Sequence, residues 1–396
     1  MIVAGVVPCA DGDVAPRWAL TRRGLRRASA VAAFWATLAG SAAAQWAPDH
    51  PDVAPLLAKA LSYLETAPDD RLGARCLVGL AFLKSGAPAD HPLVMRAVEA
   101  CREQLEAERS YSSYLYGKAL AIILLTERNQ SSDRELVRQY AELLRIHQKP
   151  HGGFGYTSEE TGDTSQTQYA ALAYWQMLHH GIAPNADSAQ SCLTWLMRTQ
   201  DVSGGWGYQG VDPGSFQRVK QEPGPSAPVS MAAAGMGSTL VLGNLVGLLK
   251  PNQGPTVMET GAEQAPLPPA LQRVDQGGAS ARSLPAGGVD ANRLRSCLAD
   301  GRQWLNKYFE IEFPQWQYYY LYSVERYQSF EEYLGYGDPD ARWFKQGLEL
   351  LRNTQADDGS WNDSCGTTCA TAFGALFLLR STQQSIKASL GEGTLV

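Results

Sequence analysis

Three segments of the chain share one spacing: a large apolar residue and Leu, three residues, Gln, three residues, Gly, one residue, and an aromatic ring. The three Gln, Gly and aromatic sets are Gln148, Gly152 and Phe154; Gln200, Gly204 and Trp206; and Gln355, Gly359 and Trp361. A variable loop after each set leads into an apolar segment rich in small residues, at 164–178, 230–249 and 367–379. Recurrence at one spacing predicts a structural repeat that is stacked several times.

The repeated unit is expected to be a helical hairpin. One helix ends near the Gln, a Gly-containing turn reverses the chain, and a second helix runs back. The Gln amide can bond backbone groups left free at a helix end, and the aromatic ring fills the gap between neighbouring hairpins. Degenerate copies lie at 60–84, 101–126 and 304–327. The sequence therefore predicts an all-α fold, an (α/α)6 toroid of six helical hairpins, with an open superhelical array as the alternative.

The repeats also divide the chain into segments. Hairpins 1 to 4 are expected in 45–250 and hairpins 5 and 6 in 291–385, with a C-terminal tail at 386–396. Between them, 251–290 contains repeated Pro and Gly and no apolar period, which predicts a flexible insertion. The uncharged stretch 229–249 is long enough to suggest a membrane span. Its four glycines, together with its Ser and Asn residues, favour an inner helix packed closely on its neighbours.

Residues 1–44 are expected to be an export signal. Four arginines between 22 and 27 precede an apolar stretch, 28–38, and a small-residue run, 41–44. The order of residues 21–26 resembles a twin-arginine signal. We therefore predict a mature chain that begins near Gln45, is periplasmic or extracellular, and is not an integral membrane protein. The alternatives are a disordered or mis-started N-terminus and an uncleaved anchor helix.

Composition excludes one class of partner and favours another. The formal net charge of -6 and the absence of a basic stripe after residue 30 argue against nucleic-acid binding. The 10 Trp and 17 Tyr residues are typical of a packed core or an apolar cavity.

The predicted mature chain has six cysteines, of which only Cys365 and Cys369 are close neighbours. We expect Cys369 to be buried, and the turn between the two makes a disulfide geometrically feasible.

The Gln-xxx-Gly-x-Trp pattern resembles the QW repeat of squalene-hopene and oxidosqualene cyclases. The run 152–156, followed by Asp163, Thr164 and Ser165, resembles hairpins of protein prenyltransferase β-subunits. The C-terminal runs 318–326 and 358–361 are similar to uncharacterised exported members of this superfamily. The resemblance covers roughly 55–250 and 291–385, and it implies an α/α toroid.

The catalytic signatures that the resemblance would imply are missing. Triterpene cyclases use an Asp-x-Asp-Asp cluster, and the nearest acids at comparable positions are Asp163 and the pair Asp357-Asp358. Prenyltransferases hold zinc with Asp-x-Cys and a later His. Cys369 falls where that Cys would lie, but Thr367 replaces the Asp and no His follows. We therefore expect no metal and no cofactor. Asp163 is either a helix N-cap or, as the alternative, a catalytic acid.

Function is expected to depend on the central cavity. The predicted ligand-facing residues are Trp316, Tyr319, Tyr322, Glu325 and Arg326, although these rings could instead pack between hairpins. The favoured prediction is a protein that binds an apolar, isoprenoid or lipid-like ligand, or an envelope protein partner, without the catalytic motifs of the family.

Two other functions remain open at this point. One is a terpenoid-cyclase-like isomerase or lyase that uses Asp163 as its acid, and the other is a sugar-active α/α barrel. The inner surface distinguishes them: an aromatic, dry lining favours isoprenoids, clustered carboxylates favour sugars, and a filled interior favours a scaffold.

Overall fold

The computed structural model describes residues 46–108, 115–221, 228–251 and 283–390. Regular structure in these ranges is almost entirely helical, and the prediction of an all-α fold is confirmed. The helices are α2 (Ala54–Thr66), α3 (Leu72–Lys84), α4 (Pro92–Glu108), α5 (Leu115–Arg128), α6 (Arg134–Arg145), α7 (Thr164–His179), α8 (Ala186–Arg198), α9 (Val229–Leu245), α10 (Ala291–Tyr308), α11 (Gln317–Tyr333), α12 (Arg342–Thr354), α13 (Thr367–Leu378) and α14 (Ser381–Ser389). A short 3-10 helix, Ser131–Asp133, precedes α6, and β1 (Gly162–Asp163) pairs antiparallel with β2 (Gln209–Gly210).

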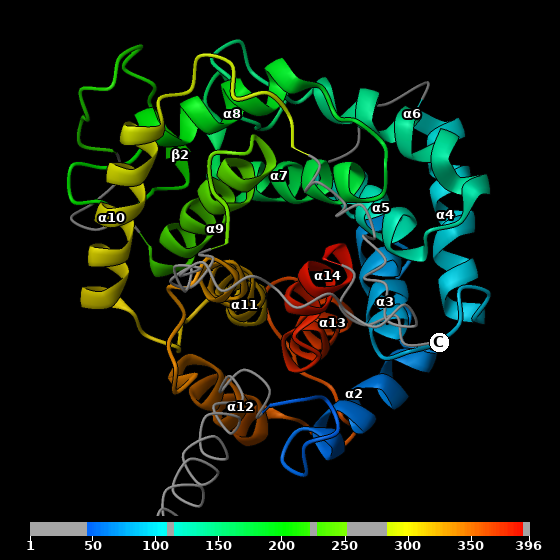
Figure 1. The fold of residues 1–396 in the computed structure, drawn as a ribbon. Coiled ribbons are helices and arrows are strands. Elements are labelled where there is room, and N and C mark those ends of the chain that lie inside the picture. Colours follow the sequence, from blue (N-terminus) through cyan, green and yellow to red (C-terminus); the bar gives the residue numbers. More distant parts are fainter. Residues whose placement is uncertain (1–45, 109–114, 222–227, 252–282, 391–396) are drawn as a thin grey trace, which may run out of the picture.

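The helices form a ring of hairpins (Figure 1). Helices α3, α5, α7, α9, α11 and α13 lie on the inside, each packs on the next, and α13 packs on α3. Helices α2, α4, α6, α8, α10 and α12 alternate with them on the outside. The hairpins placed by the repeats thus correspond to α2–α3, α4–α5, α6–α7, α8–α9, α10–α11 and α12–α13. The inner helices form a closed cycle, so the described hairpins leave no unpaired end.

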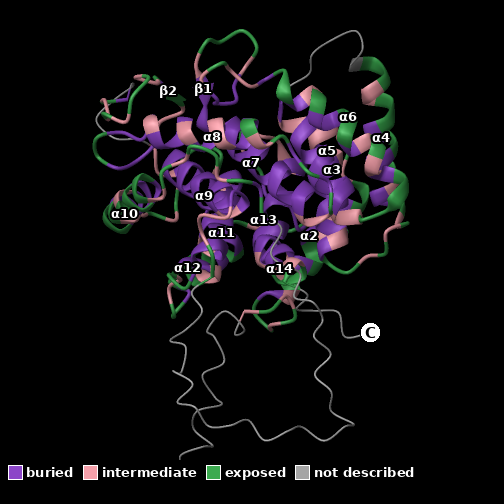
Figure 2. Cartoon of the chain, turned by 45° about the horizontal axis from the view of Figure 1, so that its top comes forward, coloured by how far each residue is buried: buried purple, intermediate pink, exposed green. Residues whose placement is uncertain are grey.

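Burial follows from position in the ring (Figure 2). Every residue of the inner helix α7 from Thr164 to Leu178 is buried, and the residues are mostly apolar or small, with three glutamines among them. The outer helix α6 buries only Val137, Tyr140, Ala141 and Leu144, a three-and-four spacing that places one stripe against the ring. Helix α9, within the uncharged stretch 229–249, is an inner helix. No helix in the described ranges is long and apolar enough to cross a membrane.

The three Gln residues of the repeat make the same pair of hydrogen bonds. Each Nε2 donates to the carbonyl of the Gly four residues on, at 2.7–3.0 Å. Each also donates to a backbone carbonyl on the next outer helix: Gln148 to Ser188, Gln200 to Cys297 and Gln355 to Leu56. The last of these bonds joins the final hairpin to the first, so this amide is one of the contacts that close the ring.

The repeat glycines allow neighbouring hairpins to come close. Gly152, Gly204 and Gly359 have φ values of 105°, 101° and 88°, where a side chain is strained. A Cβ at each would overlap a backbone carbonyl of the next outer helix; at Gly204 it would lie 2.7 Å from the carbonyl oxygen of Asp300. The aromatic rings that follow, Phe154, Trp206 and Trp361, are fully buried. Glycine is therefore required twice at this position, by conformation and by space.

The structure differs from the sequence analysis at the segment boundaries. The predicted export signal and residues 252–282 of the predicted insertion lie outside the described residues. The end of the insertion is packed, because Leu284 N donates to Leu245 O and Gln190 Nε2 donates to Pro285 O. Helix α14 crosses the boundary placed at residue 385, so residues 386–389 of the expected tail are helical, and its last six residues are not described. The pattern at 381–389 shows no apolar stripe, and that is why the sequence did not reveal this helix.

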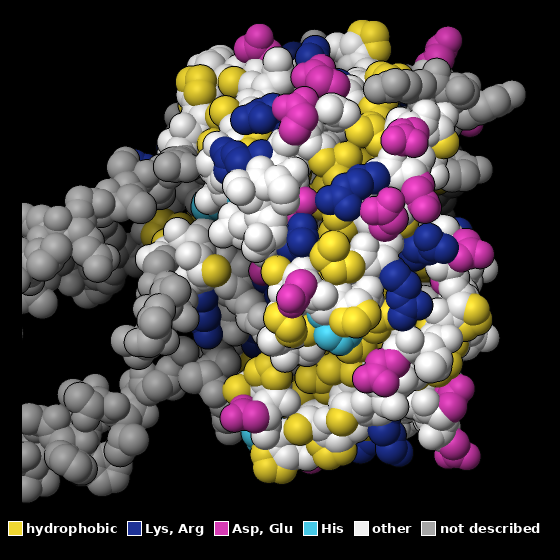
Figure 3. Space-filling view, turned by 90° about the vertical axis from the view of Figure 1, so that its right-hand side faces the viewer, with side chains coloured by type: hydrophobic (Ala, Val, Ile, Leu, Met, Phe, Trp, Pro, Cys, Tyr) yellow, Lys and Arg dark blue, Asp and Glu magenta, His cyan; other side chains and the backbone are white. Residues whose placement is uncertain are grey.

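The outer surface carries mixed charge. Exposed i,i+3 ion pairs lie along α4 and α6: Arg102–Glu99, Arg138–Glu135 and Arg145–Glu142. Figure 3, which views the side of the molecule at the right of Figure 1, shows basic and acidic side chains interspersed on that face. Exposed pairs of this kind contribute little to helix stability, because water screens the attraction between the charges. This face has no single-sign patch that would select a charged partner.

Candidate functional site

Side chains from three inner helices meet inside the ring and form what we call the lumen cluster. It comprises Gln168 and Tyr169 of α7, Tyr319, Tyr322 and Arg326 of α11, and Phe373 of α13. All six are buried. In the ring, α9 lies between α7 and α11, so contacts between α7 and α11 pass in front of α9.

Gln168 is the hydrogen-bonding centre of the lumen cluster. Its Oε1 accepts from Arg326 Nη1 at 3.0 Å and from Ser323 Oγ at 3.2 Å. Its Nε2 donates to the hydroxyl of Tyr319. One amide thus ties three residues of α11 to α7 and fixes where the Arg326 guanidinium lies.

Aromatic rings make up most of the rest of the cluster. Tyr169 stacks on Tyr319 with centroids 6.2 Å apart, and Tyr322 stacks on Phe373 at 5.5 Å. The guanidinium carbon of Arg326 lies 5.2 Å from the Tyr169 centroid and 4.4 Å from that of Tyr322. Burial raises the pKa of Tyr169, and the nearby Arg326 opposes that rise. Aromatic faces around a cation are a favourable arrangement, so the cluster combines apolar surface with one positive charge.

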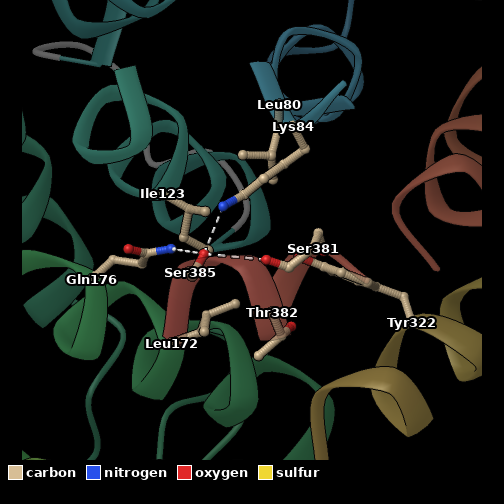
Figure 4. Close-up of a pocket in the computed structure, with 9 residues that line it drawn as sticks. All are labelled: Leu80, Lys84, Ile123, Leu172, Gln176, Tyr322, Ser381, Thr382 and Ser385. Atoms are coloured by element: carbon tan, nitrogen blue, oxygen red, sulfur yellow. Dashed lines mark hydrogen bonds between the residues drawn. The ribbon is translucent and has the colours of Figure 1, made fainter. Parts of the chain in front are cut away.

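The other end of the lumen is occupied by α14 and is polar. Ser385 of α14 accepts from Lys84 Nζ at 2.8 Å and from Gln176 Nε2 at 3.1 Å (Figure 4). Lys84 also pairs with Glu127 at 2.6 Å. These partners come from α3, α5 and α7, so α14 is held by three inner helices at this one serine. A cavity of about 10 Å³ remains beside it, bordered by Tyr322 and by apolar side chains of α3, α5 and α7. That volume is close to the minimum for one water molecule.

Glu325 faces α14 although it precedes Arg326 in sequence. Its carboxylate accepts from the backbone N–H of Thr382 at 3.1 Å and of Gln383 at 3.4 Å, and from Ser329 Oγ at 3.0 Å. A carboxylate at this place compensates the positive end of a helix dipole. Burial raises the pKa of Glu325, with Arg380 and the hydrogen bonds acting in the opposite direction. Glu325 therefore holds α14 in place rather than pairing with Arg326.

Asp163 lies at the start of α7 and is its N-cap. Its Oδ1 accepts from Gln166 N at 3.0 Å and from the Ser165 hydroxyl. Ser165 in turn shares a 2.7 Å hydrogen bond with the Tyr116 hydroxyl. Burial raises the pKa of Asp163, and its hydrogen bonds oppose the rise. The carboxylate has the structural role that its sequence position suggested, in a setting that also favours its protonated form.

Trp316 was predicted to lie in the cavity, but it does not. It precedes α11 in a left-handed backbone conformation, and its side chain is 38% exposed. Asp363 accepts its backbone N–H at 3.0 Å, which holds this turn at the rim. Two other tyrosines of α11 are bonded outside the lumen cluster: Tyr318 donates to Thr354 of α12, and Tyr320 donates to the Glu310 carbonyl in the connection between α10 and α11. Tyr319, Tyr322, Glu325 and Arg326 face inward, as their helical spacing indicates.

Several residues of the site were not predicted from the sequence. Gln168 and Phe373 belong to segments recognised as inner helices, yet nothing in their spacing distinguished them from core residues. Lys84 and Glu127 lie near the ends of α3 and α5, where charged residues are ordinarily solvated. An isolated Lys in an apolar run at 76–84 was the available signal for the polar end of the lumen.

The described residues contain no group of three His, Cys, Asp or Glu side chains that could hold a metal ion. Cys365 and Cys369 are both free thiols, and Cys369 is buried as expected. Arg71 Nη2 donates to the Cys365 carbonyl at 2.8 Å and contacts Cys369 Sγ at 3.6 Å. Burial raises the pKa of the Cys369 thiol to about 11, so the neutral form predominates at pH 7.

Comparison with known families agrees with the ring. Residues 58–221 match the family model described as squalene-hopene cyclase C-terminal domain. This match confirms, over those residues, the resemblance to the prenyltransferase and squalene-cyclase repeat superfamily. A search of curated proteins found no match. The chain is thus squalene-cyclase-like in fold, and its activity has to be argued from the lumen.

Proposed function

We propose that this chain is an exported binding protein with a squalene-cyclase-like fold, whose lumen binds an apolar, lipid-like ligand without transforming it. The main support for this proposal is the lumen cluster, in which four aromatic side chains from three different inner helices lie together. Aromatic side chains at the centre of a concave site are typical of sites for apolar ligands. The side chains and α14 fill the lumen in this structure, which is the arrangement that the sequence analysis associated with a scaffold. Binding of an apolar ligand therefore requires these side chains and α14 to move apart.

The absence of a transformation is supported by the setting of Asp163. An acid that starts a cyclisation must present a proton to the substrate, whereas Asp163 Oδ1 is engaged by Gln166 N and the Ser165 hydroxyl. Its raised pKa favours the alternative function, a cyclase-like enzyme with Asp163 as the acid. The Asp-x-Asp-Asp cluster of the cyclases is absent from the sequence. The binding protein is therefore the favoured function.

Binding can be tested with lumen variants and a matched control. Mass spectrometry of lipophilic material that copurifies from the native host would first identify the ligand. Tyr319→Ala and Tyr322→Ala should each weaken its binding about tenfold or more, because each removes a buried ring. Tyr320→Ala is the control, since Tyr320 is also buried on α11 but donates to the Glu310 carbonyl in the connection between α10 and α11, outside the lumen cluster. Equal affinity in all three variants would contradict the proposal, and loss of a measured turnover specifically in Asp163→Asn would favour the cyclase.

Export is proposed on the arginine cluster, apolar run and small-residue site at 1–44. N-terminal sequencing of the protein from its native host should give a first residue near Gln45. A chain that keeps Met1 and remains in the cytoplasm would contradict export while leaving the binding proposal intact.

A further inference from the structure

Arg326 is a buried cation without a carboxylate partner. Its side chain is 2% exposed, Nη1 donates to the neutral amide oxygen of Gln168, and the guanidinium also interacts with the Tyr169 hydroxyl. Among the described residues, no Asp or Glu forms an ion pair with it, and the neighbouring Glu325 is turned toward α14. Burying an unpaired charge is expensive, and aromatic faces recover only part of the cost. An anion beside the guanidinium would compensate this charge.

Arg380 shows what a compensated arginine looks like in the same fold. It too is 2% exposed, and its guanidinium lies over two rings, Trp343 and Phe344. Unlike Arg326, it pairs with Glu332 at 2.7 Å. The two arginines match in burial, in aromatic contact and in having two guanidinium nitrogens without a hydrogen-bond partner, and they differ in the counter-ion.

The free atoms of Arg326 have a specific geometry. Nη1 is occupied by Gln168, while Nε and Nη2 have no hydrogen-bond partner. Nε–H and one Nη2–H point in parallel from one edge of the planar guanidinium, and this edge binds two oxygens of a carboxylate or phosphate at once. Gln168 thus fixes the group at one corner and leaves a complete bidentate edge unused.

We propose that Arg326 is an oxyanion-binding residue of the lumen, which pairs through Nε and Nη2 with a carboxylate or phosphate at the end of an apolar ligand. This inference rests on the proposed binding function and adds the chemistry of the ligand's head. Tyr169 and Tyr322 then lie against the Arg326 guanidinium that binds the head group. Tyr319 and Phe373, which contact each other, would contact the hydrocarbon chain of the ligand. Tyr322 also borders the cavity beside α14. A ligand that enters and widens this cavity is separated from the Arg326 guanidinium only by the Tyr322 ring.

Three ten-carbon probes separate the head group from the chain: decanol, decanoate and decyl phosphate. Calorimetric titration of the purified protein should give an affinity for decanoate or decyl phosphate about tenfold or more above that for decanol, because charge-assisted bidentate bonds form only with the anions. Arg326→Met should bind all three probes alike. Comparison of the two anions tells whether the site prefers the planar or the tetrahedral group.

Thermal melting of the ligand-free protein distinguishes a ligand-binding arginine from one that stabilises the fold. Arg326→Met should melt no lower than wild type, because it replaces an unpaired buried charge with an apolar chain of similar length. Arg380→Met should melt lower, since it leaves Glu332 without its partner.

Three other outcomes would each contradict a specific part of the proposal. Equal affinity of wild type for all three probes would overturn the role of Arg326 and leave the binding of apolar chains standing. No binding of any probe would overturn both. A marked fall in the melting temperature of Arg326→Met, with the anion preference retained by the folded fraction, would show that Arg326 only supports the ring.

Discussion

The same hairpins form the repeat turns and the lumen, but the turns repeat one set of contacts whereas the lumen side chains differ from hairpin to hairpin. At the turns, Gln148, Gln200 and Gln355 make one set of bonds three times, in helices whose other residues differ. In the lumen, no inner helix repeats another: α7 contributes an amide and a ring, α9 small residues, and α11 rings and charges. The turns hold hairpins at a fixed distance, and that leaves the inner faces free to vary. Function is therefore to be sought where the repeat is broken.

The largest expected effect is at a repeat glycine. Gly359→Ala would place a Cβ against the Lys59 carbonyl, in a strained conformation, where the last hairpin meets the first. We expect a loss of about 3–5 kcal/mol in the free energy of unfolding, measured by chemical denaturation. Gly86→Ala is the matched control, because Gly86 has a similar φ of 94° but no atom within 4 Å of the added Cβ.

The control separates strain from crowding. Gly86→Ala should cost only about 1–2 kcal/mol, the price of the left-handed backbone alone. Similar losses in the two variants would mean that close approach of the hairpins is not what the repeat glycine provides.

The repeat glutamines should give the next largest effect. Gln200→Ala leaves the Gly204 and Cys297 carbonyls buried without their donor, so we expect a loss of about 2–3 kcal/mol. Gln355→Ala breaks the equivalent bonds in a more exposed setting and should cost about 1–2 kcal/mol. Gln139→Ala, on the exposed face of α6, should change stability by less than about 0.5 kcal/mol. If all three variants unfolded alike, the repeated bonds would not hold the hairpins together.

The same contrast explains what could be predicted from sequence. Gln, Gly and Trp at one spacing identify a turn because their chemistry is local, so the hairpins and the inward side of α11 follow from pattern alone. Gln168 could not be assigned, because its partner Arg326 is 158 residues away and the position of Gln168 itself carries no local signal. Trp316 was misplaced because a left-handed residue before a helix does not follow helical spacing. Helix α14 has three buried polar residues, Ser381, Thr382 and Ser385, and therefore lacks the apolar pattern of a core helix.

A smaller, pH-dependent effect should distinguish the α14 end of the lumen. Burial raises the pKa of Glu325 in the folded chain above its ordinary value of 4.5. The folded state then holds the proton more tightly than the unfolded state. The resulting stabilisation is present below about pH 4.5 and is lost as the pH rises through the raised pKa.

Glu325→Gln removes this titration, so its stability relative to wild type should improve as the pH rises through that window. Arg380 is the charged group that opposes the rise in the pKa of Glu325. Denaturation series of both proteins from pH 4 upward would measure the difference. Parallel curves would mean that Glu325 titrates alike in the folded and unfolded states.

The smallest expected effect is at Asp163, and it bears most directly on catalysis. Asn is as good an N-cap as Asp, and the chain itself uses Asn185 to cap α8 through a 2.8 Å bond to Ser188 N. Asp163→Asn should therefore change the free energy of unfolding by less than about 0.5 kcal/mol, whereas Asp163→Ala should cost about 1 kcal/mol. Asn185→Asp is the reciprocal control and should also be nearly neutral. If Asp163→Asn keeps ligand affinity as well, the carboxylate serves α7 and not a substrate, because amide and carboxylate cap a helix alike but only the acid can donate a catalytic proton.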